Sequence, residues 1–137
     1  MYGNYSNYSP IRNNSSTTTE VEIIENFSPN QTKLIDSNYL PLVGIISKIQ
    51  SNGEIRIRLY YNSDYRLSDL PRAETTPITG NHGCFFDNNT DPLLDNIRIL
   101  SPPPIYYLEN KAYFCITNKD SVSKQIRIKL NIISLIK

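Results

Sequence analysis

Hydrophobic and polar residues alternate along much of this chain, most clearly over residues 54–61, Glu-Ile-Arg-Ile-Arg-Leu-Tyr-Tyr. Side chains of a β-strand point alternately to two faces, so this pattern predicts a strand with one face in a core and the other in solvent. Asn52-Gly53 stands just before it, and such a pair is favoured in two-residue hairpin turns. The preceding run, residues 42–50, is therefore predicted to pair with it antiparallel.

The same alternation predicts roughly seven to nine strands along the chain. Besides the two just described, we expect strands at residues 19–27, 32–36, 83–87, 95–101, 105–108, 111–118 and 123–136. Turns rich in Pro and Asn separate them at intervals of about 8 to 15 residues, which is typical of antiparallel sandwiches. We predict an all-β fold, an antiparallel Greek-key β-sandwich of the jelly-roll or immunoglobulin-like type.

Three features interrupt the strand pattern. At Ile132-Ile133 the alternation slips by one residue, which predicts a β-bulge. Gly44 indicates either a bulge or a close approach of the backbone to a neighbour. Residues 102–104 are all proline and cannot donate ladder hydrogen bonds, so we expect an extended crossing at a sheet edge. Ile97 and Ile99 are expected to face opposite to Arg98.

The longest irregular stretch, residues 62–80, is expected to contain one or two helical turns. Ser63 would cap the helix and Pro71 would end it. Leu67 and Leu70 would then share one face.

Residues 1–19 differ in kind from the rest of the chain. They are rich in Asn, Ser, Thr and Tyr and have almost no aliphatic residues, so they bury too little apolar surface to offset the entropy of ordering. We divide the chain into a low-complexity, extended N-terminal arm, residues 1–19, and a β-sandwich domain, residues 20–137. We expect the arm to contact a neighbouring subunit, with packing against its own domain as the alternative; its interface residues would be Tyr2, Tyr5, Tyr8, Ile11 and Arg12.

Composition argues against several partners. The 14 Lys and Arg residues nearly balance the 13 Asp and Glu residues, for a formal net charge of +1. Such a chain produces no strong field to attract nucleic acid or an anionic membrane. No apolar run approaches the ~18 to 20 residues of a membrane span, and the first residues do not read as a signal peptide. We expect no nucleic-acid partner, no membrane association and synthesis in a cytoplasm.

The residues that most often carry chemistry form no recognisable pattern. His82 is the single histidine, and no Ser, Cys or Asp stands in a triad order around it, so we expect it to pack, to stabilise a turn or to contact a ligand. Cys84 and Cys115 are expected to be buried, reduced thiols. Residues 87–91 favour an Asx-type turn over a Ca²⁺ loop. We predict no catalytic residue, no metal and no cofactor.

Tyrosine is unusually frequent, with 10 Tyr and no Trp, and several tyrosines adjoin an arginine-rich loop. One interpretation is a local ion pair between Arg66 and Asp69 that stiffens the loop. The other is a surface for a protein partner or a carboxylated glycan, with forked arginine donors and broad tyrosine rings. The residues of this predicted surface are Tyr60, Tyr61, Tyr65, Arg66, Asp69, Arg72 and His82.

Three segments follow one another in the middle of the chain: Gly53-x-Ile-x-Ile-Arg58-Leu59-Tyr60, then Tyr65-Arg66-x-x-Asp69-x-x-Arg72, then Pro77-x-x-Gly80-x-His82-Gly83. Together with Leu100-Ser101-Pro102 and Ile116-Thr117-Asn118, this order resembles small β-sandwich virion proteins of tailed bacteriophages, including cyanophages. The resemblance covers about residues 40–136 and leaves out the arm.

The resemblance implies a non-enzymatic virion structural protein, made in the host bacterial cytoplasm and assembled in symmetric copies. Tail, baseplate or fibre attachment is preferred over capsid decoration (a cement protein). Its partners would be copies of itself and other virion proteins. A carbohydrate-binding module that recognises a host surface glycan is the alternative from another class, and a glycan-cleaving enzyme is a third.

Overall fold

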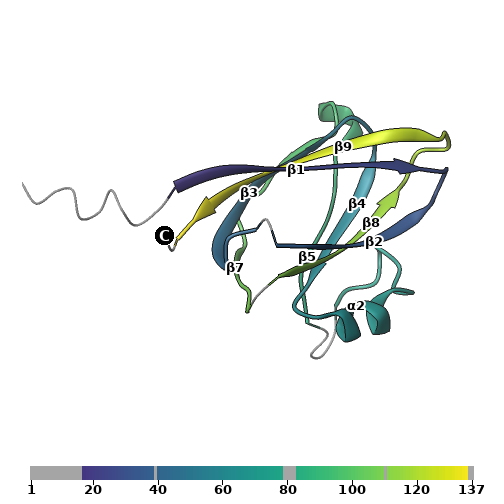
Figure 1. Ribbon diagram of the computed structural model, residues 1–137. Helices are drawn as coiled ribbons and strands as arrows, with labels where there is room; N and C mark the ends of the chain where they lie inside the picture. Colours follow the sequence, from purple (N-terminus) through teal and green to yellow (C-terminus); the bar gives the residue numbers. More distant parts are fainter. Residues whose placement is uncertain (1–16, 39, 79–82, 110, 136–137) are drawn as a thin grey trace, which may run out of the picture.

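The computed structural model describes residues 17–38, 40–78, 83–109 and 111–135. Over these residues the chain forms two antiparallel β-sheets packed face to face (Figure 1), which confirms the predicted all-β sandwich. The first sheet has the order β1 (Thr17–Phe27), β9 (Lys124–Ser134), β3 (Val43–Ser51), with β6 (Ile97–Ile99) and β7 (Ile105–Tyr107) both paired to β3. The second has the order β2 (Thr32–Ser37), β8 (Ala112–Asn118), β4 (Ile55–Tyr60), β5 (Cys84–Asn89).

The strands pair in a nested order. β4 pairs with β5, β3 with β6 and β7, β2 with β8, and β1 with β9, so each pair encloses the previous one along the chain. Two short helices lie in the connections: α2 (Ser63–Asp69) follows β4, and the 3-10 helix η1 (Pro92–Leu94) follows β5. The first and the last described strands are therefore neighbours in one sheet.

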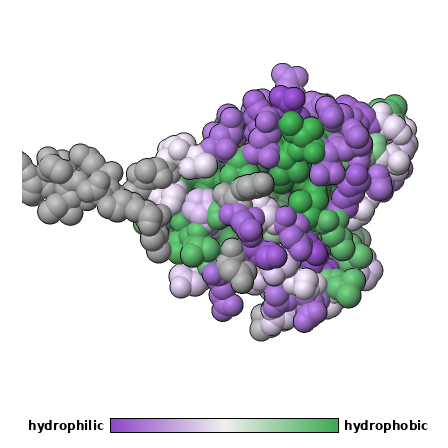
Figure 2. Space-filling view, in the orientation of Figure 1, coloured by the Kyte–Doolittle hydropathy of each residue, from purple (hydrophilic) through white to green (hydrophobic). Residues whose placement is uncertain are grey.

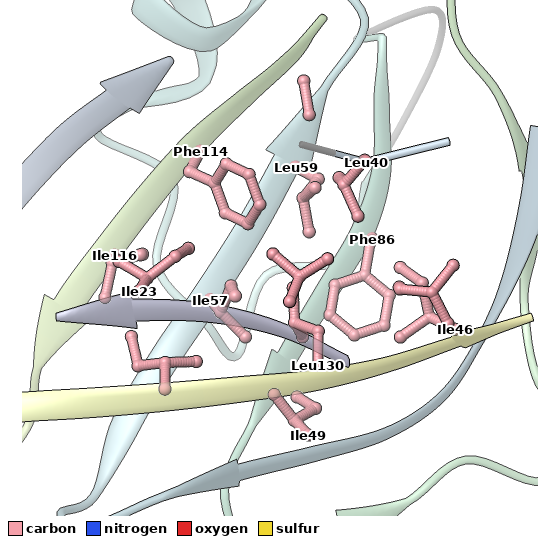
Figure 3. Close-up of a cluster of buried hydrophobic side chains, with 14 of the residues drawn as sticks. Ile23, Leu40, Ile46, Ile49, Ile57, Leu59, Phe86, Phe114, Ile116 and Leu130 are labelled. Atoms are coloured by element: carbon pink, nitrogen blue, oxygen red, sulfur yellow. The ribbon is translucent and has the colours of Figure 1, made fainter. Parts of the chain in front are cut away.

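The core lies between the two sheets, where side chains from both point toward one another (Figure 3). Each such aliphatic or aromatic side chain contributes about 1.5 to 3 kcal/mol when it is fully buried. The alternation that predicted strands at β8 and β9 is confirmed, since every second residue on each is buried. The side chains labelled in Figure 3 are Ile23, Ile46, Ile49 and Leu130 of the first sheet, Ile57, Leu59, Phe86, Phe114 and Ile116 of the second, and Leu40.

The predicted bulge at Ile132-Ile133 is wrong, because β9 keeps its alternation through Ser134. The register shifts instead in the partner strand β3, between Ile46 and Lys48. Ser47 is the extra residue, and its hydroxyl donates a hydrogen bond to the Asn131 carbonyl oxygen at 3.2 Å. Ile133, the second isoleucine of the pair, therefore lies on the outer face of β9, and two adjacent isoleucines occur here without a slip of the strand.

The predicted hairpin across Asn52-Gly53 is also wrong, because β3 and β4 belong to different sheets. Asn52 holds this crossover to β9: its side chain donates to the Gln125 carbonyl oxygen at 3.0 Å and accepts from the Arg127 N–H at 2.9 Å. A Cβ on Gly53 would lie 2.8 Å from a carboxylate oxygen of Asp120. A larger residue here would require the Asp120 carboxylate to shift.

Gly44 does mark a close contact, as one of the two alternatives predicted. A Cβ at this position would lie 2.7 Å from the Tyr106 hydroxyl oxygen, so Tyr106 of β7 can pack over β3 only if residue 44 is glycine. The proline-rich crossing between β6 and β7 lies at the sheet edge, as predicted, and the Ile46 N–H still bonds the Pro104 carbonyl oxygen at 3.1 Å.

The predicted arm, residues 1–19, overlaps the first strand by three residues. Residues 17–19 already belong to β1, where they lie opposite Ser134, Ile133 and Ile132 of β9. Threonine is β-branched and suits a strand once a partner strand is present. Tyr2, Tyr5, Tyr8, Ile11 and Arg12 lie outside the described residues.

Candidate functional site

The outer face of β4 is buried, although the alternation predicted it to be in solvent. Arg56, Arg58 and Tyr60 are 6%, 2% and 0% exposed. The helix α2 and the segment that follows it cover this side of the second sheet (Figure 1). Arg58 donates to the Asp69 and Leu70 carbonyl oxygens at 3.2 and 3.3 Å, which fastens the end of the helix to the strand.

Beneath this cover lies a cluster of paired charges, which we call the buried ionic network. Asp87 of β5 accepts two hydrogen bonds from Arg56, at 3.0 and 2.9 Å, and a third from Arg72 at 2.7 Å. Asp69 accepts two more from Arg72, at 2.8 and 3.0 Å, and one from the Tyr60 hydroxyl at 2.6 Å. Paired, two-pronged contacts of this kind are the strongest that arginine makes with a carboxylate.

The network also sets the protonation of its members. Burial by itself would raise the pKa of Asp87, but the hydrogen bonds from Arg56 and Arg72 outweigh burial and hold the pKa below its usual range. The same balance, with Arg72 and Tyr60 as donors, lowers the pKa of Asp69. Burial and the hydrogen bond to Asp69 raise the pKa of Tyr60. Both carboxylates are therefore charged and the phenol is neutral near neutral pH.

The predicted pair between Arg66 and Asp69 is wrong: Asp69 binds Arg72, and Arg66 binds Asp36 of β2 at 2.7 Å. Arg66 also donates to the Phe114 carbonyl oxygen at 3.1 Å. The predicted apolar face of the helix fails as well, because Leu67 is 65% exposed. The underside of α2 is polar because it meets arginines and backbone oxygens rather than hydrophobic side chains.

The predicted ligand surface is therefore not assembled as an exposed platform. Tyr61 is 43% exposed and lies against Phe85, with ring centroids 4.6 Å apart. Tyr65 is half-buried. His82 lies outside the described residues, and the other members of the set, Tyr60, Arg66, Asp69 and Arg72, lie under or within the helical cover.

Neither cysteine offers a reactive thiolate. Both are free, as predicted: Cys115 is buried and Cys84 is half-buried. Burial raises the pKa of each thiol. Cys84 lies beside the ionic network, and its Sγ donates weakly to the Phe86 carbonyl oxygen at 3.5 Å.

Among the described residues, no group of three or more His, Cys, Asp or Glu side chains is placed to hold a metal ion. The Asx-type turn predicted at residues 87–91 forms only at its end, because residues 87–89 belong to β5. The Asp91 carboxylate then caps η1 by accepting from the Leu93 N–H at 3.0 Å, which is an Asx-type contact. Asp87, at the start of that segment, belongs to the buried ionic network.

A shallow groove of about 420 Å³ runs along the open edge between the sheets, bordered by β5 and the β6–β7 connection. Phe85, Ile99 and Pro102 are among its lining residues. Of the charged residues that line it, Asp87 is held by two arginines and Arg98 donates to the Asn89 carbonyl oxygen. None of the described residues that line the groove therefore offers a free acid and base for hydrolysis.

An exposed apolar surface that the sequence pattern did not predict lies on the outer face of the first sheet, and we call it the apolar stripe. Ile99, Ile105 and Tyr107 are 74%, 68% and 66% exposed. Register places Ile105 opposite Ile45, which lies opposite Ile133, and Tyr107 opposite Val43. The stripe consists of Val43, Ile45, Ile99, Ile105, Tyr107 and Ile133.

The orientation of β6 explains why the stripe was missed. Ile99 was expected to face opposite to Arg98, and of the two it is Arg98 that is half-buried and Ile99 that is exposed. The sequence does contain a pattern that could have indicated the stripe, because alternate positions of β6 and β7 are apolar on the face turned away from the core. Hydrophobic residues also gather across the middle of the face that bears β1 and β2 (Figure 2). Ile24 of β1 and Leu34 of β2 are less exposed than the members of β6 and β7, at 42% and 44%.

None of the described helices has the length and apolar character needed to cross a membrane. No protein-family model matches the sequence, and no curated protein is significantly similar to it. The likeness to phage virion proteins therefore rests on the residues quoted for it and stays a prediction.

Proposed function

We propose that this protein is a non-enzymatic structural protein of a tailed-phage virion that assembles in symmetric copies. Tail, baseplate or fibre attachment is the preferred location, with capsid decoration as the alternative. The chemistry of the described residues is consistent with this role, because the buried carboxylates, arginines and thiols are engaged inside the fold rather than presented to a substrate.

The apolar stripe is the observation that carries the proposal. Monomeric proteins rarely leave a row of large apolar side chains in water, and such a row most often marks a contact with another protein. Three of the six members are about two-thirds exposed or more, and they lie at the outer edge of a sheet. An edge strand also presents unpaired backbone groups, which favours association further.

The nested strand order gives weaker support. Two sheets built from nested strand pairs are the arrangement expected of a jelly roll, a fold used in viral capsid and lectin domains. The fold alone does not determine function, since unrelated proteins share it. The order therefore agrees with a virion protein without excluding a sugar-binding one.

A glycan-binding module has less support than assembly. Its proposed donors Arg66 and Arg72 are nearly buried and already bound to carboxylates, so a glycan would first have to displace α2. Breaking such buried pairs leaves uncompensated charges and is costly.

Sedimentation velocity of the full chain over about a hundred-fold range of concentration tests the assembly role, because association must depend on concentration. We expect a discrete oligomer. Immuno-electron microscopy of purified particles would then show whether the protein lies on the tail or on the capsid. A monomer at every concentration, together with particles that carry no label, would contradict the proposal.

A further inference from the structure

We propose that the apolar stripe binds the N-terminal segment, residues 1–16, of a second copy of this chain. This inference rests on the proposed assembly role and adds the surface and its occupant. The contact would be an exchange of segments between copies, with the body of each copy receiving the segment of another.

The stripe has the form of a receiving surface for an extended chain. It follows β3 from Val43, opposite Tyr107, to Lys48, opposite Ile99. At about 3.3 Å per residue this distance is roughly 17 Å. Ile45 and Ile133 form the half-buried floor beside the more exposed Ile105.

The sequence of the N-terminal segment matches such a surface. Its large apolar residues recur at every third position, as Tyr2, Tyr5, Tyr8 and Ile11, with Asn, Ser and Gly between most of them. In a polyproline II conformation, which has three residues per turn, all four would lie along one side. Three consecutive members would span about 19 Å at roughly 3.1 Å per residue, close to the length of the stripe.

The start of β1 lies near the stripe but points away from it. Thr17 is opposite Ser134, Ser134 is opposite Gly44, and Gly44 is opposite Tyr106, so one row crosses four strands. At about 4.8 Å between strands, Thr17 lies roughly 14 Å from β7. To cover its own stripe, the segment would have to reverse at Thr17 and cross two strands sideways.

A second copy avoids that reversal. Sixteen residues can extend to roughly 50 Å, enough to leave one sheet along its strands and reach another body. The stripe has six residues, whereas a standard interface buries about 800 Å² and about 20 to 30 residues on each partner. An extended segment laid along the stripe adds contact area that the two bodies lack by themselves.

Three variants of the full chain test this proposal by sedimentation. Ile105→Lys alters the stripe, and the triple substitution Tyr2→Ser, Tyr5→Ser, Tyr8→Ser alters the segment. Leu67→Lys is the matched control, because it charges an equally exposed apolar residue on α2. We expect the first two to raise the dissociation constant at least about ten-fold and the control to leave it unchanged. Urea unfolding of each variant verifies that the fold is intact.

Mixing the two defective variants gives the decisive result. One retains an intact stripe and the other an intact segment, so we expect the mixture to recover hetero-association that neither variant shows alone. If the mixture does not recover, or if only Ile105→Lys weakens association, the segment is not the occupant and this inference falls while the assembly role stands. If the unaltered full chain is a monomer throughout, this inference falls, and the assembly role falls with it if purified particles carry no label.

Discussion

Asp87 is the residue on which the buried ionic network depends most, because it accepts hydrogen bonds from both Arg56 and Arg72. Replacing it by Asn removes the charge and leaves two nearly buried guanidinium groups without their shared partner. We expect Asp87→Asn to lower the free energy of unfolding by about 3 kcal/mol, as when one member of a buried pair is removed. Urea unfolding followed by circular dichroism measures this change.

Asp95→Asn serves as the control, since Asp95 is exposed and has a left-handed backbone that asparagine also adopts readily. We expect its effect to stay within about 0.5 kcal/mol. Equal effects of the two substitutions would show that the network does not stabilise the fold.

The lowered pKa values of Asp69 and Asp87 predict a dependence of stability on pH. Each carboxyl has a lower pKa in the folded chain than in the unfolded chain, so its contribution is complete above the unfolded value of about 3.9 and is lost as pH falls through the folded value. We expect the free energy of unfolding to fall steeply with acid below about pH 4. The fall should be shallower in Asp87→Asn, and parallel curves for the two proteins would argue against this assignment.

The burial of single residues was predicted well for side chains that face the core and poorly for side chains on the outer faces of the sheets. The inward positions of β4, such as Ile57, are buried as the alternation required. The outward arginines were expected in water because arginine is charged. Nothing in their own strand shows that a later segment, ending at Arg72, folds back to pair with the same carboxylate, Asp87.

At the level of an element, α2 allows the predicted N-cap, Ser63, to be compared with the N-cap in the structure, Asn62. The structure places Asn62 at the N-cap, where its side chain accepts from the Tyr65 N–H at 2.8 Å. Asn62→Ala should therefore lower the free energy of unfolding by about 1 kcal/mol. Ser63→Ala leaves that bond in place and should change it by less than about 0.5 kcal/mol, within the usual range for surface substitutions. Urea unfolding measures both changes. A larger loss in Ser63→Ala than in Asn62→Ala would indicate that Ser63 is the cap.

Elements were predictable from local pattern, but their partners were not. Strands such as β8 and β9 follow from alternation and lie within a few residues of the expected ranges. Asn52-Gly53 predicted a hairpin from its local turn preference, yet contacts of Asn52 with β9 make it a crossover between sheets. Contacts between residues far apart in sequence decided the pairing, and a single sequence does not display them.

At the scale of the whole molecule, the described residues by themselves supply a core around which the two sheets close. A chain that begins at Thr17 should therefore fold, with a free energy of unfolding within about 1 kcal/mol of the full chain. Urea unfolding at low protein concentration, where association contributes little, makes the comparison. A truncated chain that fails to unfold cooperatively would show that residues 1–16 belong to the fold itself.

The fold class could be predicted because strand spacing and turn composition are properties of the sequence. The candidate interaction surface could not, since the stripe is created by register: Ile105, Ile45 and Ile133 come from three distant segments and become neighbours only in the sheet. Similarly, the tyrosines and arginines of the predicted binding surface are unusual in the sequence, but the burial of most of them depends on the position of α2, which the sequence does not show.

The pairing of β1 with β9 has a consequence for how the chain is made. Phe27 emerges from the ribosome roughly a hundred residues before its partner Lys124, an interval of about 5 to 20 seconds at ordinary rates of synthesis. Throughout that time β1 has no neighbour on either side, and its apolar positions are open to chaperones or to the same strand of another nascent chain. The polar sequence ahead of β1 would help to keep that waiting strand in solution.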